Sequence, residues 1–286
     1  MIPGKDMHME TFLELLKAVL FGIVEGVTEW LPVSSTGHMI LLDEFVRLKM
    51  SAAFYDMFEV VIQLGAILAV ILLFFHKLNP LSPKKDALQK KNTWQLWFKV
   101  VVAVIPSAVI GVLLDDWMDA KLHNGIVVAI ALIVYGVAFI LVERKNDGKH
   151  LRRVDDVHKI DYKTALLIGA FQCLSLVPGT SRSGSTILGA IMLGVGRGAG
   201  AEFSFFMAIP TMLGASAIKG LKFMLSGVGI TGTEIAVLVV GCVVSFLVSL
   251  VVIKGLMDYV RRHSFSVFGV YRIVLGAVVL AYFLIF

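Results

Sequence analysis

Long apolar blocks alternate with short polar segments along the chain. Six blocks are almost free of charge, and several reach the ~17–25 residues that cross a bilayer as a helix. They cover residues 57–75, 100–114, 125–142, 203–218, 235–253 and 269–286. The block at 100–114 is short and needs its flanking aromatic residues to cross. The pattern predicts an all-α polytopic membrane protein with about six transmembrane helices.

The composition agrees with a chain embedded in membrane lipid. Of its 286 residues, 58% are hydrophobic and only 16% are charged, whereas soluble domains are roughly half apolar and a quarter charged. The net charge of +5 comes without a basic stripe that alternates with aromatic residues, so we expect no nucleic-acid partner. Basic loops of a membrane protein more often anchor it on the cytoplasmic side.

Loop charges predict an orientation for the spans. Segments 76–99 and 143–163 carry six and seven Lys or Arg residues, whereas 115–124 is acidic with a single lysine. The positive-inside rule places the first two in the cytoplasm and the third outside. Residues 12–50 and 164–200 then each begin and end on one side of the membrane. Because each is too long for a loop and too interrupted for one span, we expect two re-entrant helical hairpins.

The two halves of the chain resemble each other in sequence. Residues 22–41 align with 169–188 at an offset of 147 positions, with five identities. We predict an inverted-topology repeat, in which residues 1–143 form the first repeat and 164–286 the second. Each repeat has a hairpin followed by three spans, and 144–163 is a basic cytoplasmic linker. Such repeats place a binding site near the bilayer midplane, where the interruptions meet.

Two carboxylates interrupt the first hairpin. Glu25 and Glu29 are four residues apart and share one face of a helix. A charge at the bilayer centre costs about 2.5–3.5 kcal/mol or more, so such groups pair, bind a cation or line water. The pair suits a hard divalent cation such as Mg²⁺, or alternatively Ca²⁺, with water and a substrate phosphate completing its shell. The other interpretation is that they lie near the interface or are protonated.

A polar run, SSTGH at residues 34–38, follows the carboxylates. Ser34 and Ser35 are candidate nucleophiles, and His38 is a candidate base three residues further on. Alternatively, Ser34 or Ser35 only caps the next helix. The two interpretations are compatible, because a helix N-terminus offers free N–H groups and a positive dipole end to an anion.

The sharpest motif is PGTSRSGST at residues 178–186. Arg182 stands there in apolar surroundings and needs an anionic partner, and its planar fork suits phosphate oxygens. Flanking glycines let backbone amides approach such a ligand. The predicted phosphate-binding residues are Gly179, Thr180, Ser181, Arg182, Ser183 and Thr186. The alternative is a salt bridge from Arg182 to Glu25 or Glu29 that holds the repeats together.

Both motifs resemble those of the undecaprenyl-diphosphatase family of bacterial membranes, the bacitracin-resistance type. EGVTEWLPVSSTGH is similar to the glutamate-rich first motif of that family, and PGTSRSGST is similar to its second. The chain length, the two halves and the sequence QLGAILAV also agree, so the resemblance covers nearly the whole chain.

The resemblance implies hydrolysis of undecaprenyl diphosphate to undecaprenyl phosphate and inorganic phosphate in the bacterial inner membrane. This reaction recycles the lipid carrier for cell-wall synthesis and confers resistance to bacitracin. The resemblance also implies a homodimer and a site that opens to the periplasm. It makes Glu25 and Glu29 metal-associated and assigns catalysis to Glu25, Glu29, Ser34, Ser35, His38 and Arg182.

The residues leave two alternatives open. Either a serine attacks the phosphate while His38 accepts its proton, or His38 activates water directly. A lipid-phosphate carrier or flippase would need the same anion-binding arginine without hydrolysis. The carboxylate pair and His38 favour an enzyme, because a carrier has less need of a metal and a base.

Overall fold

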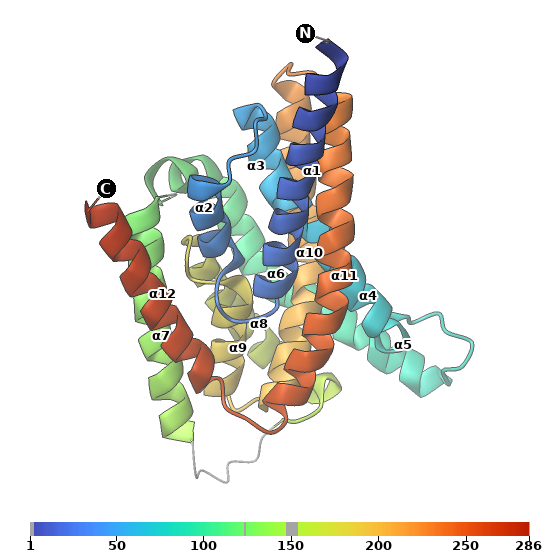
Figure 1. Ribbon diagram of the computed structural model, residues 1–286. Helices are drawn as coiled ribbons and strands as arrows, with labels where there is room; N and C mark the ends of the chain where they lie inside the picture. The colour runs from blue at the N-terminus through green and yellow to red at the C-terminus, as the bar shows by residue number, and fades with distance from the viewer. Residues whose placement is uncertain (1–2, 123, 147–153, 286) are drawn as a thin grey trace.

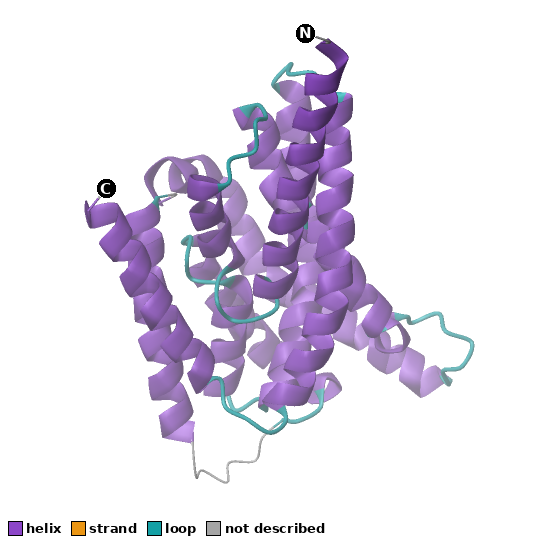
Figure 2. Ribbon diagram, viewed as in Figure 1, coloured by secondary structure: helices purple, strands orange, loops and turns teal. Residues whose placement is uncertain are grey.

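The regular structure of the chain is helical (Figures 1 and 2). The computed structural model describes residues 3–122, 124–146 and 154–285. The predicted linker at 144–163 therefore falls partly outside the described residues. Within the described ranges, one isolated bridge joins Val154 to Val195.

Twelve α-helices and two short 3-10 segments make up the described chain. They are α1 (Pro3–Thr28), α2 (Ser35–Phe45), α3 (Ala52–Val61), α4 (Gln63–Leu73), α5 (Phe75–Leu78), α6 (Ala87–Leu122), α7 (Gly125–Asn146), η1 (Val157–Lys159), α8 (Tyr162–Gln172), η2 (Cys173–Leu176), α9 (Arg182–Met192), α10 (Arg197–Leu225), α11 (Gly232–Val260) and α12 (Ser266–Ile285).

Six segments of the described chain are long and apolar enough to cross a membrane, as predicted. They are Ala52–Leu73, Ala87–Leu114, Gly125–Asn146, Arg197–Leu225, Gly232–Val260 and Ser266–Ile285. The apolar block at 100–114 is the second part of a longer helix, α6, which begins at Ala87. The first turns of α6 are polar, so the continuous apolar stretch of the sequence covers only about the second half of this span. The protein is a multi-pass membrane protein.

Helix–loop–helix pairs occupy the two remaining stretches. The α1–α2 pair falls in 12–50, except that α1 begins earlier, at Pro3. The α8–α9 pair falls in 164–200, except that α8 begins at Tyr162. Residues 29–34 and 177–181 connect the helices of each pair, and both loops lie in the middle of the bundle (Figure 2).

Small residues allow the long helices to approach closely. A Cβ on Gly22 of α1 would lie 2.8 Å from the carbonyl oxygen of Gly241 on α11, and a Cβ on Gly26 would lie 2.8 Å from that of Ser245. Helices in lipid associate through such close packing, because lipid tails are as apolar as the side chains and the hydrophobic effect does not favour helix association there. The contact with α11 explains why α1 is longer than expected, since α11 supports it along its length (Figure 1).

Helices of each half of the chain pack against helices of the other half. In the first half α1 packs against α11 of the second half, and in the second half α8 packs against α6 of the first. Likewise α4 packs against α11, and α10 against α6. Each half therefore supplies the walls that surround the other half's loop.

Candidate active site

The central loops share an unusual backbone conformation. Ser34 and Ser181 have φ angles of 75° and 73°, and among the described residues they are the only non-glycine residues with positive φ. Such a conformation costs on the order of 1–3 kcal/mol and persists where its surroundings demand it. The Ser34 hydroxyl accepts a hydrogen bond from Gly37 N at 3.2 Å, and Ser181 accepts one from Gly184 N at 3.1 Å. Both serines therefore cap helices, and the capping interpretation of Ser34 is confirmed.

An ion pair joins the two loops. The Nε and Nη2 atoms of Arg182 donate to Oε1 of Glu29 at 3.2 and 3.1 Å. Its Nη1 atom donates to the carbonyl oxygen of Ser204 at 2.8 Å. The side chains are only 10% and 5% exposed. The salt-bridge interpretation of Arg182 is thus confirmed, with Glu29 as the partner.

Ser35 completes this arrangement. Its hydroxyl donates to Oε2 of Glu29 at 2.7 Å in a buried hydrogen bond. One carboxylate oxygen therefore faces the arginine and the other faces the serine. A serine hydroxyl bonded to a carboxylate is the geometry of a nucleophile and its base.

A small cavity lies at this junction. It measures about 160 Å³, and both loops as well as α4 and α10 contribute to its walls. The predicted site residues that line it are Glu29, Ser34, Ser35, Gly179, Ser181 and Arg182. The sequence motifs from the two halves therefore meet around one space.

The other three predicted phosphate-binding residues are buried outside this lining. Thr180, Ser183 and Thr186 are each 0% exposed. The Ser183 hydroxyl donates to the carbonyl oxygen of Glu29 at 3.0 Å, and Thr186 exchanges a 2.7 Å hydrogen bond with Ser204. The structure does not bring these side chains to the cavity; Ser183 and Thr186 instead hold the loops and helices in place.

Glu25 faces a different cavity. This second space, about 400 Å³, is lined by Glu25, Asp56, Glu59 and Lys219, and it shares Thr36 and Gln63 with the first. Oε1 of Glu25 is buried and has no hydrogen-bond partner among the described residues. The side chain therefore has an oxygen that a ligand could use.

Glu25 and Glu29 are the residues that could hold a metal ion, and they line two cavities that share Thr36 and Gln63. Among the described residues, no three His, Cys, Asp or Glu side chains form a group that could hold a metal ion. Mg²⁺, however, commonly binds one or two carboxylates and completes its shell with water and substrate phosphate. Glu25 offers an unpartnered oxygen, and the Glu29 oxygens have lone pairs beyond those that accept from Arg182 and Ser35.

His38 is turned away from the serine hydroxyls. Its Nδ1 atom lies 2.7 Å from the carbonyl oxygen of Ser34, and its Nε2 atom lies 2.7 Å from the hydroxyl oxygen of Tyr271. Because a carbonyl only accepts, Nδ1 carries a proton, and when the ring is neutral its Nε2 atom accepts from Tyr271. His38 is also absent from the lining of the Glu29–Arg182 cavity. The structure therefore does not bring it to Ser35.

Sequence reasoning missed Arg272 on α12. This side chain is 0% exposed. Its Nη1 atom donates to the carbonyl oxygen of Pro32 at 3.1 Å, and its Nη2 atom donates to those of Gly179 and Thr180 at 2.8 and 2.9 Å. One guanidinium thus ties both central loops. The available signal was a single arginine inside an apolar span, which marks a functional position by itself.

Replacing Arg272 with methionine is expected to destabilise the protein. Hydrogen bonds from charged donors contribute about 1.5–3 kcal/mol, and the substitution leaves three buried carbonyls without this donor. We expect a loss of about 3 kcal/mol in the free energy of unfolding, measured by denaturation in detergent. Arg262→Met, at an exposed loop position, is the control and should change stability by less than about 0.5 kcal/mol. An Arg272→Met protein as stable as Arg262→Met would contradict this role.

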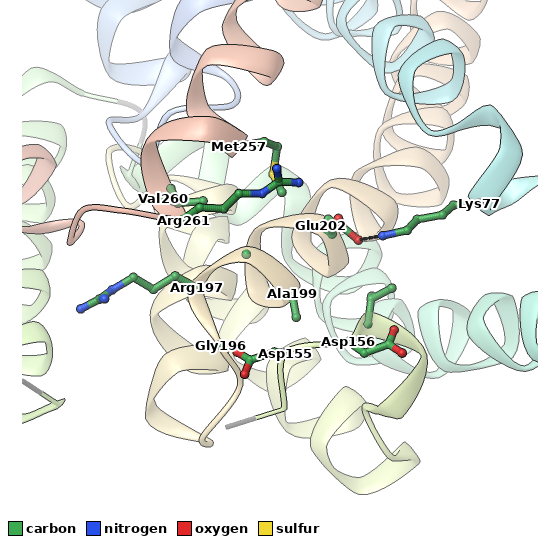
Figure 3. Close-up of a pocket in the computed structure, with 12 residues that line it drawn as sticks. Lys77, Asp155, Asp156, Gly196, Arg197, Ala199, Glu202, Met257, Val260 and Arg261 are labelled. Atoms are coloured by element: carbon green, nitrogen blue, oxygen red, sulfur yellow. Dashed lines mark hydrogen bonds and ion pairs between the residues drawn. The ribbon is translucent and has the colours of Figure 1, made fainter. Parts of the chain in front are cut away.

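Another cavity lies where α10 begins and α11 ends (Figure 3). It measures about 450 Å³, and side chains of both charges line it. Lys77 and Glu202 form an ion pair at 2.5 Å, and Arg197 pairs with Glu143 of α7. None of the predicted site residues lines this space among the described residues. It is separate from the candidate active site.

A buried carboxylate, serine and arginine between membrane-crossing helices define a multi-pass membrane hydrolase. This class agrees with the match of residues 18–278 to the family described as "Bacitracin resistance protein BacA". The chain belongs to the BacA family.

Similar proteins extend over nearly the whole chain. An undecaprenyl-diphosphatase of Limosilactobacillus fermentum is 58% identical over 95% of this chain and 98% of its own length. Undecaprenyl-diphosphatase 1 of Clostridioides difficile is 60% identical over 96% and 99%. An undecaprenyl-diphosphatase of Enterococcus faecalis is 53% identical over 96% and 99%. The resemblance stated from the two motifs is confirmed.

Proposed function

We propose that this protein hydrolyses undecaprenyl diphosphate to undecaprenyl phosphate and inorganic phosphate. The observation that carries the proposal is the contact of Glu29 with both Ser35 and Arg182 in one buried cavity. The similar proteins named undecaprenyl-diphosphatase support the choice of substrate. The reaction would return the lipid carrier to cell-wall synthesis and protect against bacitracin.

Arg182 binds the phosphate in this mechanism. Phosphoryl transfer depends mostly on positioning and on electrostatic stabilisation of the transferred group. The Nε and Nη2 atoms that now share one Glu29 oxygen form the planar fork that can hold two phosphate oxygens. The capped N-termini of α2 and α9, at Ser34 and Ser181, add their positive dipole ends.

Ser35 is the proposed nucleophile and Glu29 its base. The Ser35 oxygen forms a bond to the terminal phosphorus while its proton passes to Oε2 of Glu29, 2.7 Å away. The bond from that phosphorus to the bridging oxygen breaks, and undecaprenyl phosphate leaves. Water then releases inorganic phosphate from the serine. Ser34 is less suited to attack, because its hydroxyl caps α2.

His38 has a different part in this proposal from the one expected from the sequence. Its bonds to the Ser34 carbonyl and to Tyr271 make it a support for the first loop. Glu29 instead takes the role of base, since it directly contacts the nucleophile. Direct activation of water remains the alternative route, with no covalent intermediate.

Glu25 and Glu29 would hold a divalent cation, Mg²⁺ or Ca²⁺. When bound, such a cation neutralises charge on phosphate oxygens. The unpartnered Oε1 of Glu25 supports this proposal.

An inverted repeat accounts for how the site is built. Two structural observations support it: Ser34 and Ser181 cap their helices in the same strained conformation at the 147-residue offset, and α1 and α8 exchange packing partners. In this proposal residues 1–143 and 164–286 are the repeats, and the loops of two re-entrant hairpins meet near the midplane. A homodimer, implied by the family resemblance, stays a prediction.

Purified protein in detergent should release phosphate from undecaprenyl diphosphate. A chelator should lower the rate at least about tenfold, Mg²⁺ should restore it, and Glu25→Gln should raise the cation concentration needed, because one carboxylate ligand is lost. Glu234→Gln is the control, since Glu234 is also buried but belongs to the capping box of α11. It should need no more cation than wild type.

The outcomes separate the proposals. If the chelator leaves the rate of phosphate release unchanged, the proposed role of the divalent cation is wrong. Binding of lipid diphosphate without phosphate release would remove the hydrolase proposal and favour the carrier.

A further inference from the structure

An apolar groove adjoins the candidate active site between α6 and α10. It measures about 470 Å³ and shares Ser175, Thr211 and Ala215 with the Glu29–Arg182 cavity. We call it the α6–α10 groove; its walls include Val104, Ala108 and Val112 of α6 and Pro210, Gly214 and Ile218 of α10. The groove is thus continuous with the space that holds the proposed nucleophile.

The charges around the site divide it into two sides. Among the described residues that line the groove, the charged ones are Lys219 and Lys222, and none is acidic. The cavity that contains Glu25 has Asp56 and Glu59 in its lining besides Lys219, which lines both spaces. Among the described lining residues, the groove therefore has no carboxylate to repel an anionic lipid, whereas the Glu25 cavity has three.

Glycine positions show that the groove is open. A Cβ on Gly214 would have no heavy atom within 4 Å, and a Cβ on Gly111 would meet only Leu176, at 3.5 Å. Prolines interrupt both walls, Pro106 in α6 and Pro210 in α10. A proline inside a helix removes one backbone hydrogen bond from it.

We propose that the α6–α10 groove binds the isoprenoid units next to the diphosphate, so that the lipid enters the site between these two helices. The proposal rests on the proposed function. Lipid chains are as apolar as the groove, so transfer into it adds little hydrophobic free energy. The groove acts through packing contacts and through orientation of the scissile bond.

Gly214→Leu tests this directly, because a Cβ at this lining position would have no heavy atom within 4 Å and the larger side chain would take up space in the groove. With farnesyl diphosphate, which carries three isoprene units, we expect KM to rise at least about tenfold. The inhibition constant of inorganic diphosphate, which has no tail, should be unchanged. This second measurement shows that the variant is folded and that its phosphate site is intact.

Gly220→Leu is the matched control. Gly220 lies on the same helix, its Cβ would also have no neighbour within 4 Å, and it is outside the groove lining. Its KM should equal that of wild type. A second variant, Gly214→Ala, fills less space and should raise KM by a smaller factor, which keeps the test valid if the leucine variant does not fold.

The results distinguish the groove from the function. If Gly214→Leu and Gly214→Ala both have the KM of Gly220→Leu, the groove holds only bulk lipid or detergent, and the proposal is overturned. If wild-type protein releases no phosphate from farnesyl or undecaprenyl diphosphate, the proposed function itself fails.

Discussion

Arg182→Lys is expected to lower kcat for phosphate release at least about a hundredfold, the loss typical of removing one donor that stabilises transition-state charge. Lysine keeps the positive charge but has no planar fork. Arg182 uses Nε and Nη2 on Glu29 while Nη1 is anchored on Ser204 O. The single ammonium group of lysine cannot present two parallel N–H donors and also donate to the carbonyl oxygen of Ser204. Initial rates of phosphate release in detergent measure the effect.

Arg197→Lys is the matched control for this prediction. Arg197 also forms an ion pair with a buried carboxylate, Glu143, but at the far end of α10 from the Glu29–Arg182 cavity. Its substitution should reduce stability and leave kcat within about twofold of wild type. If Arg182→Lys turned over as fast as Arg197→Lys, the bidentate role of Arg182 would be wrong.

Ser35→Ala is expected to lower the rate at least about a thousandfold, because loss of a nucleophile removes the covalent route as a whole. Lipid diphosphate labelled on its terminal phosphate and mixed with wild-type protein should leave phosphate on Ser35 after rapid acid quench. The same experiment with Ser35→Ala should trap none. The measurement combines rapid quench with identification of the labelled residue.

Ser185→Ala controls for the loss of a buried hydroxyl near the site. Ser185 is 0% exposed and donates to the carbonyl oxygen of Arg182, which also accepts from Thr186. Its substitution therefore leaves that carbonyl satisfied and should change the rate by less than about threefold. A Ser35→Ala protein with full activity would exclude the covalent route and leave direct attack by water.

Much of the fold follows from local sequence. Continuous apolar stretches have to cross a bilayer as helices, because the backbone finds no partner in hydrocarbon. The sequence interpretation underestimated the length of α6, because the first turns of this helix are polar and carry Lys90, Lys91 and Lys99. The sequence indicated that either Glu25 or Glu29 could pair with Arg182. The structure shows that Glu29 is the partner.

Two features of the site could not be read from the sequence. Arg272 bonds to backbone carbonyls that lie 240 and about ninety positions away, namely those of Pro32, Gly179 and Thr180, and a carbonyl belongs to every residue type. His38 follows Ser35 closely, but its ring bonds to Tyr271, which is 233 positions away. Closeness in the sequence determines roughly where the backbone of a residue lies. The direction of its side chain depends on the tertiary structure.

The packing of each half against the other has a consequence for how the protein is made. Helix α1 is translated before α11, yet its Gly22 and Gly26 face packs on that later helix. During most of synthesis, the turn that carries Glu25 therefore lacks its final neighbour. Packing of α1 into its final place has to wait until α11 has entered the membrane, so the central cavity forms only after α11 has been translated.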